Sequence, residues 1–162
     1  MNSYFSMFPQ VLCSVDGKTV QSITDFLRRV SPTDYAQTNA VLYQQYTIND
    51  GETAEYLADQ CYGDPELEWI FFLVNNIVDP RYDWPMSNAD LLAYCNNKYT
   101  NVYDTHHDEN TNGLICDNGV GTVSISNLDY EISLNESKRN IAILLPELVT
   151  KFVDEMKTQV NS

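Results

Sequence analysis

Two adjacent histidines, His106 and His107, are the side chains in this sequence best suited by type to catalysis or metal binding. Acidic residues surround them at Asp104, Asp108 and Glu109. Neighbouring residues point to opposite faces of a strand and do not face each other on a helix, so the doublet forms no ready chelate. The zinc spacings H-E-x-x-H and C-x-x-C are absent from the sequence. We interpret the pair as polar residues near a turn and expect no metal site.

Motifs of nucleophilic catalysis and phosphate transfer are missing as well. The sequence has no G-x-S-x-G elbow, no Walker loop and no G-x-G-x-x-G turn, and Gly119–Gly121 is too short to cradle a phosphate. Acidic pairs such as Glu66 with Glu68 are explained by the negative charge that helix N-termini favour. We predict that the protein is not an enzyme and uses no cofactor.

The four cysteines are spread along the chain without the spacing of a zinc ribbon or a redox pair. They are Cys13, Cys61, Cys95 and Cys116. The N-terminus has neither the basic start nor the continuous apolar run of a secretion signal. We therefore expect free thiols in a reducing compartment.

Charge excludes two classes of partner. The 162 residues include 23 acidic and 9 basic side chains, for a formal net charge of −14. Phosphate backbones and anionic lipids are bound through Lys and Arg, so an acidic chain repels them. No apolar stretch approaches the roughly 20 residues that span a bilayer. We expect one modest core, made in a cytoplasm, with neither nucleic acid nor membrane as partner.

The first 45 residues predict an extended arm. Two extended runs flank Asp16-Gly17, a dipeptide that favours hairpin turns because glycine tolerates positive φ. A short helix over 24–30 and a polar, tyrosine-bearing connector over 31–45 follow. We treat residues 1–45 as an N-terminal arm.

Residues that begin and end helices are most frequent directly after this arm. A short strand, Tyr46–Ile48, precedes a helix with Thr53 at its N-cap. Gly63 ends that helix, and Asp64 with Pro65 begins the next. The apolar positions of the first helix lie on one face at Ala54, Leu57, Ala58 and Cys61.

The second helix is apolar on two faces. Its first face holds Leu67, Ile70, Phe71 and Val74, and its second holds Trp69, Phe72 and Leu73. A helix that is apolar nearly all round is buried nearly all round. Either the chain's own arms or another subunit must cover the second face.

The remaining chain predicts a helix, then hairpins, then a second helix. After a turn-rich segment, Ser87 caps a helix over 88–95 with Asp90 three residues on. Turns at Asn112-Gly113 and Asn118-Gly119 predict hairpins within 98–132. A final helix begins at Pro146. Its apolar stripe consists of Leu148, Val149, Phe152, Val153, Met156 and Val160.

The segment "YTINDGET", "LA", "YGDP", "WIFFLVNN" resembles a LysM module in the order of its motifs. The resemblance implies a βααβ fold that binds N-acetylglucosamine polymers in a shallow groove between two loops, 49–52 and 76–79. Residues 77–95 stand where that family has its second strand. The groove that the resemblance implies consists of Asn49, Asp50, Gly51, Glu52, Asn76 and Ile77.

A longer resemblance covers nearly the whole chain. "FPQVLCSVDGKTVQSITDFLRRV", the central segment through "NNIVDPRYDWPMS", and "SNLDYEISLNESKRNIAILLPELV" are similar to baseplate wedge proteins of T-even-like contractile-tailed phages, the gene-53 type. The resemblance implies a structural subunit of the virion, assembled in the host cytoplasm. It implies contacts with other wedge subunits, with the sheath-initiating protein and with the central hub.

We therefore predict an α+β fold with a small βααβ LysM-like core. The core with a helical extension occupies 46–100, between the arm 1–45 and a C-terminal hairpin and helix over 101–162. The residues that we expect at burial points or partner contacts are Trp69, Phe72, Leu73, Trp84, Lys138, Arg139, Phe152 and Met156. The alternatives to a wedge subunit are a peptidoglycan-binding module of a tail or cell-wall protein and a small wall hydrolase.

Overall fold

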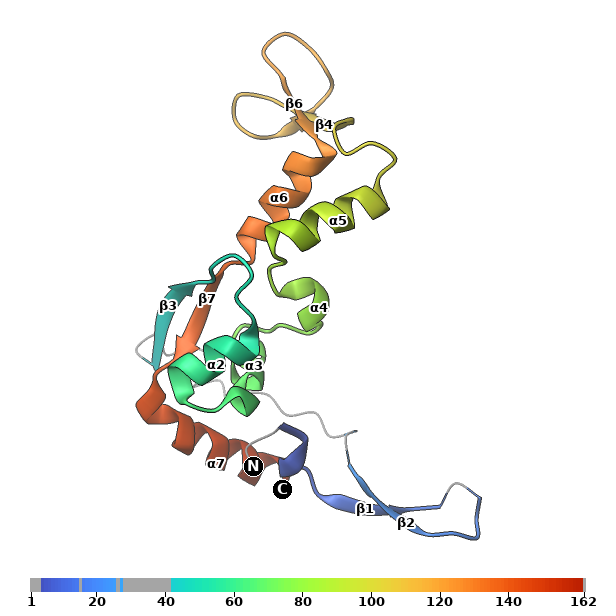
Figure 1. Ribbon diagram of the computed structural model, residues 1–162, viewed down its shortest axis with the longest axis vertical. Coiled ribbons are helices and arrows are strands. Elements are labelled where there is room, and N and C mark those ends of the chain that lie inside the picture. The colour runs from blue at the N-terminus through green and yellow to red at the C-terminus, as the bar shows by residue number, and fades with distance from the viewer. Residues whose placement is uncertain (1–3, 15, 26, 28–41, 162) are drawn as a thin grey trace. The chain divides into compact units, whose positions relative to one another are not determined.

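The computed structural model describes residues 4–14, 16–25, 27 and 42–161. Strands and helices occur in separate runs along the chain, with β1 to β3 followed by helices and then by β4 to β6, so the fold is α+β (Figure 1). The chain divides into two compact units, each assembled from separated stretches. Unit 1 consists of Met1–Tyr46, Thr53–Val78 and Ile141–Ser162, and unit 2 consists of Thr47–Glu52 and Asp79–Asn140. The three-part division at 45 and 100 stays a prediction.

Unit 1 begins with a 3-10 turn, η1 (Tyr4–Met7), and a hairpin. Strands β1 (Gln10–Cys13) and β2 (Gln21–Thr24) pair antiparallel without a break in register. Gly17 adopts the predicted positive φ of 68°, and Asp16 Oδ1 accepts hydrogen bonds from the N–H groups of Lys18 and Thr19. The hairpin prediction is confirmed, whereas most of the predicted helix over 24–30 and the start of the connector lie outside the described residues.

Helix α2 (Ala54–Tyr62) begins and ends as predicted. Thr53 Oγ1 accepts a hydrogen bond from Tyr56 N–H at 3.2 Å, and Gly63 closes the helix with φ 71°. Asp64 then caps η3 (Pro65–Leu67) through a bond from Glu66 N–H. These caps depend on residues a few positions apart, which is why the sequence predicts them.

Helix α3 (Trp69–Val74) places both of its apolar faces against unit 1 itself. Trp69, Ile70 and Phe71 are buried, and Phe72, Leu73 and Val74 pack partly buried on the same core. Asn76 follows with a positive φ of 54°, a conformation that asparagine tolerates at a helix end.

The closing strand of unit 1 comes from far along the chain. Strand β3 (Tyr43–Thr47) pairs with β7 (Asn140–Leu144), which runs in the opposite direction (Figure 1). Residues 77–95, which stand where the LysM pattern has its second strand, contain helices and no strand, and β3 pairs instead with β7 after a long intervening segment. Along the chain, the elements of this part of unit 1 follow in the order β3, α2, α3 and β7.

The C-terminal helix completes this core. It begins with η4 (Pro146–Leu148) and continues as α7 (Val149–Val160). The predicted apolar stripe is buried apart from Leu148, which is partly buried. The core cluster contains Met7, Phe8, Leu67, Trp69, Ile70, Leu144, Val149, Phe152, Val153, Met156 and Val160.

Unit 2 contains two longer helices and a small sheet. Helix α5 (Asn88–Lys98) is capped by Ser87 as predicted and runs three residues longer than expected. Strands β4 (Thr105–Glu109), β5 (Ile115–Cys116) and β6 (Val123–Ser126) form a sheet in the order β5-β4-β6. The Asn112-Gly113 turn joins the antiparallel strands β4 and β5, so a hairpin is confirmed there, whereas the strands on either side of Asn118-Gly119, β5 and β6, both pair with β4 and not with each other.

Two helices of unit 2 are absent from the prediction. Helix α4 (Pro80–Asp83) is a single turn capped by Asp79 inside the segment predicted to be turn-rich. Helix α6 (Asn127–Ser137) begins where further hairpin was expected. Its buried positions are Asn127, Glu131 and Asn135, so it has helical spacing without an apolar stripe. In the described part of the chain, no helix has the length and apolarity needed to cross a membrane.

Candidate partner-binding sites

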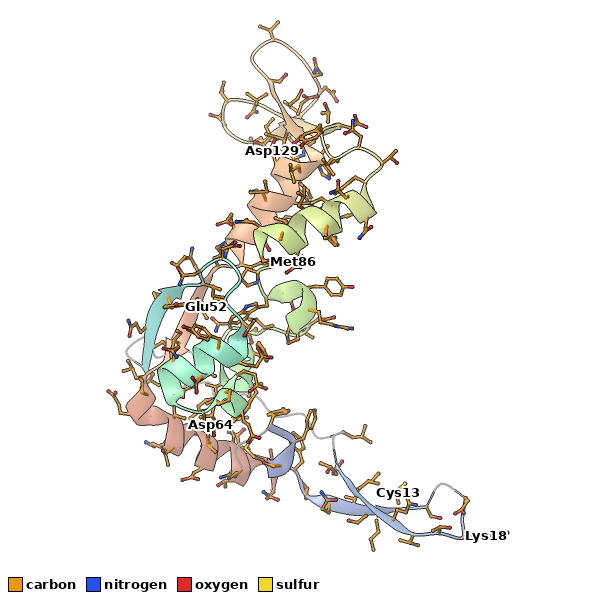
Figure 2. All side chains as sticks on the ribbon, viewed as in Figure 1. Cys13, Lys18, Glu52, Asp64, Met86 and Asp129 are labelled. Atoms are coloured by element: carbon orange, nitrogen blue, oxygen red, sulfur yellow. The ribbon has the colours of Figure 1, made fainter. Side chains whose placement is uncertain are left out.

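The loop 49–52 folds tightly on itself and is held by unit 2. Glu52 Oε2 accepts hydrogen bonds from the main-chain N–H and the side-chain amide of Asn49, at 3.0 and 3.3 Å. Gly51 has φ 72°, which permits the turn. Figure 2 labels Glu52 in this loop. The loop is therefore a rigid turn and not an open strand end.

Three groups from the rest of unit 2 bind this loop. Trp84 Nε1 donates to the carbonyl of Glu52 at 2.9 Å, and Asn88 N–H donates to Asp50 Oδ1 at 2.9 Å. Arg139 approaches the same Asp50 oxygen at 3.5 Å. Polar groups that the LysM resemblance assigns to a glycan thus already have partners within the chain.

The other half of the predicted groove belongs to unit 1. Asn76 is exposed, and Ile77 donates its N–H to the carbonyl of Phe72 at 2.8 Å. A glycan groove joining the two loops stays a prediction.

Arg139 is buried inside unit 2, with 7% of its surface exposed. Its Nε donates to Glu136 Oε1 at 2.7 Å, and a terminal nitrogen donates to the carbonyl of Ile48 at 3.2 Å. Lys138 caps the C-terminus of α6 and donates to the carbonyl of Tyr82 at 2.7 Å. The two basic residues thus follow the end of α6 and make these contacts within unit 2.

Trp69, Phe152 and Met156 lie in the core of unit 1. The Trp69 ring is 4% exposed and stacks on Phe152, with ring centroids 6.1 Å apart. Tyr4 of the N-terminal arm contacts Trp69 from another side at 5.5 Å. Phe72 and Leu73 are partly buried against the same cluster. The sequence left two alternatives for what covers the second face of α3. In the structure, residues from the chain's own arms pack against it.

Asn75 ties α3 to the closing strand. Its Nδ2 donates to the carbonyls of Phe71 and Ala142, each at 2.9 Å, and its Oδ1 accepts from Ala142 N–H at 2.8 Å. The side-chain amide thus pairs with β7 as another strand would. The LysM-like motif "WIFFLVNN" includes Asn75. That its side chain bonds to β7 could not be predicted from the sequence.

A buried polar network joins α5 to α6. Glu131 Oε1 accepts hydrogen bonds from Lys98 Nζ and Tyr99 Oη, both at 2.7 Å. Burial opposes ionisation of Glu131, yet these two donors outweigh it and lower its pKa. Asn135, 2% exposed, binds both the N–H and the carbonyl of Met86. The signal missed in the sequence is the four-residue spacing of Asn127, Glu131 and Asn135.

The side chains of His106 and His107 are in contact, so the expectation that they point to opposite faces is wrong. An irregularity in β4 between Thr105 and His107 shifts the register. It brings the two Nδ1 atoms to 2.8 Å, while His107 Nε2 lies 3.0 Å from Glu109 Oε1. The ring of Tyr130 stacks on His106 at 3.9 Å. The described residues contain no group of three or more His, Cys, Asp or Glu placed to hold a metal ion, and all four cysteines are free.

Exposed apolar side chains gather on two pieces of β structure. In the hairpin of unit 1 they are Val11, Leu12, Val20 and Ile23, and in the sheet of unit 2 they are Leu114, Ile115, Val120 and Val123. Figure 2 labels Cys13 and Lys18 on the hairpin. In unit 2, Ile115 and Val123 flank Glu109 in the pairing register. Both surfaces are candidate sites of protein contact, because contiguous exposed apolar patches mark such sites.

Comparison with known proteins assigns the family. A profile described as Base plate wedge protein 53 matches residues 13–114, more than half of the 162 residues. The Baseplate wedge protein gp53 of Enterobacteria phage T4 is 35% identical over 57 residues. That match covers 35% of this chain and 29% of the T4 protein, less than a third of that relative's length. The extent of the profile match, from β1 to the loop after β4, shows that the chain belongs to the base plate wedge protein 53 family.

Proposed function

We propose that this protein is a structural subunit of a contractile-tail baseplate wedge and joins wedge subunits around the central hub through protein contacts. The observation that carries the proposal is the family match over residues 13–114. The contacts include other wedge subunits and the sheath-initiating protein. The protein performs no reaction in this role and assembles into the virion from the host cytoplasm.

The distribution of polar and apolar groups supports a binding role. Arg139, which was singled out in the sequence, and Glu131, which was not, both make their hydrogen bonds inside unit 2. The hairpin of unit 1 and the sheet of unit 2, by contrast, expose apolar side chains on short strands. Contact through such strands needs no pocket and no cofactor.

Co-expression tests the proposal. The full chain is produced with the other wedge subunits of the same phage, and the complexes are separated by size-exclusion chromatography with light scattering. We expect the chain to elute with at least one wedge subunit. Elution as a free monomer in every combination would refute the wedge assignment.

A peptidoglycan-binding module is the second candidate; the order of β3, α2, α3 and β7 along the chain supports it, because the LysM-like motifs imply a βααβ fold. The test is retention on purified peptidoglycan, with Asp50→Ala and Asn49→Ala as variants. Retention that these variants abolish would favour glycan binding. Against this candidate stand the bonds that Trp84 and Asn88 make to the same loop.

A further inference from the structure

The hairpin of β1 and β2 has two open edges. It forms a two-stranded sheet among the described residues, and most side chains of both strands are exposed. Two-stranded hairpins are marginally stable in water by themselves. A third strand would add both main-chain hydrogen bonds and apolar contact.

The pairing register identifies the main-chain groups that face outward. Antiparallel pairs alternate between those that exchange hydrogen bonds and those that do not. Asp25 N–H donates to the carbonyl of Pro9 at 2.9 Å, so this pair belongs to the first kind. Counting along the register, Val11 with Ile23 is again of the first kind. The N–H and C=O of Gln10 and Leu12 therefore point away from β2.

The outer edge of β1 is short, but its four residues include none of three devices that prevent strand pairing. Proteins blunt unused edges with lysine, proline or a bulge. Strand β1 reads Gln-Val-Leu-Cys, and its register with β2 is continuous. Leu12, at the middle of this edge, is 78% exposed, and Val20 is 63% exposed. The edge of β2 presents Ser22 and Thr24, whose hydroxyls bond to the Gln10 side chain.

Net charge distinguishes two possible binding partners of this edge, a second copy of the chain and a different protein. Between Gln10 and Thr24 the chain has one acid, Asp16, and one base, Lys18, so the hairpin is neutral. A second copy would bring together two chains of −14 each, which repel one another. A partner that carries less negative charge avoids this repulsion.

We propose that the outer edge of β1 binds the exposed edge strand of a β-sheet in another baseplate protein and extends that sheet by strand addition. This rests on the proposed function, since it names the surface through which the wedge contact is made. Main-chain hydrogen bonds at Gln10 and Leu12 supply the pairing, and the Leu12 side chain supplies apolar contact.

Substitutions on the two edges test the proposal. Leu12→Pro removes an outward N–H, leaves the β1–β2 bonds in place and is tolerated at an edge strand. Leu12→Thr keeps that N–H and strand propensity but loses the apolar side chain, and Ser22→Pro alters the opposite edge. The full chain and each variant are titrated against every other wedge subunit of the phage, immobilised one at a time.

We expect Leu12→Pro to weaken binding by at least about tenfold, because a lost hydrogen bond also leaves a partner carbonyl unpaired. Leu12→Thr should lose less than Leu12→Pro, and Ser22→Pro should bind as the wild type does. Equal binding by Leu12→Pro, equal loss from Leu12→Thr, or loss from Ser22→Pro alone would overturn the proposal. Self-association that Leu12→Pro abolishes would overturn the choice of a different protein.

Hydrogen exchange provides a measurement that needs no variant. In the free chain the Leu12 amide should exchange fast and the Val11 amide slowly, because only the latter is paired to β2. On binding to the wedge subunit, the Leu12 amide should become protected by at least about tenfold. An unchanged Leu12 amide in a chain that binds would overturn the strand addition. A wild-type chain that binds no wedge subunit would instead refute the proposed function.

Discussion

Asn75 holds the closing strand of unit 1 through three hydrogen bonds, and removing them provides a direct test of the fold. Asn75→Ala deletes the bonds to the carbonyls of Phe71 and Ala142 and from Ala142 N–H. Each such bond contributes about 0.5–1.5 kcal/mol, so together they amount to about 2–4 kcal/mol of the free energy of unfolding. For a chain of this length the loss corresponds to roughly 4–16 °C in Tm.

Asn75→Asp sharpens the test because it preserves the shape of the side chain and replaces the donor of two hydrogen bonds with an acceptor. A carboxylate oxygen would face two carbonyl oxygens, which raises the pKa of the introduced acid. A raised folded pKa means that the folded state binds the proton more tightly, so stability increases as the pH falls through that pKa. Asn75→Asp should therefore be least stable relative to the wild type at pH 7 and recover part of the loss near pH 4.5.

Urea unfolding followed by fluorescence measures these effects. The chain has two tryptophans, Trp69 in unit 1 and Trp84 in unit 2, so a Trp84→Phe background makes the signal report on unit 1. Asn76→Asp is the matched control, since Asn76 is exposed and follows directly in sequence. The reasoning fails if Asn75→Asp is as stable as Asn76→Asp at pH 7, or if its stability deficit does not shrink at pH 4.5.

Three further predictions concern buried charge. Burial raises the pKa of Glu68, whose Oε2 has no hydrogen-bond partner among the residues that the structure describes, so the wild type should gain stability as the pH falls from 7 towards 5. Glu68→Gln should be more stable at pH 7 by about 0.5–1 kcal/mol in urea unfolding; a loss would contradict this. The lowered pKa of Glu131 contributes stability above the unfolded value of about 4.5, which is lost as the pH falls through the folded value. Glu131→Gln should cost about 1–3 kcal/mol at neutral pH and flatten that acid loss, measured by hydrogen exchange in α5 and α6; an unaltered pH profile would count against it. Arg139→Lys keeps the charge but loses the planar fork that reaches Ile48 and Glu136. It should lower Tm by about 3–8 °C, and a Tm within 1 °C of the wild type would show that the fork is dispensable.

Local features of the fold were predictable because their causes lie within a few residues. The Thr53 cap, the Gly63 stop, the Asp16-Gly17 turn and the Ser87 cap each depend on a side chain and a main-chain group no more than four positions away. The C-terminal helix was predictable from its apolar stripe. Helix α6 was not predicted because its buried face is polar. Hydrophobic periodicity does not detect a stripe of Asn127, Glu131 and Asn135.

The candidate site was less predictable than the elements. The sequence singled out Trp69 and Arg139 for their type, and burial in the chain explains both of them. Leu12 was not singled out, because one leucine in an extended run carries no signal of its own. Its value as a contact depends on the strand register, which decides which main-chain groups face outward.

By itself, the sequence determined the family, the helix ends, the turns and the absence of a recognisable catalytic motif, all of which are encoded in residue types at short spacing. Only the tertiary structure decided which strand closes unit 1. Thr47 of β3 and Asn140 at the start of β7 share a 2.8 Å hydrogen bond across 93 residues. No local pattern encodes such a pairing, because the free energy that selects it comes from the core that the paired strands help to cover.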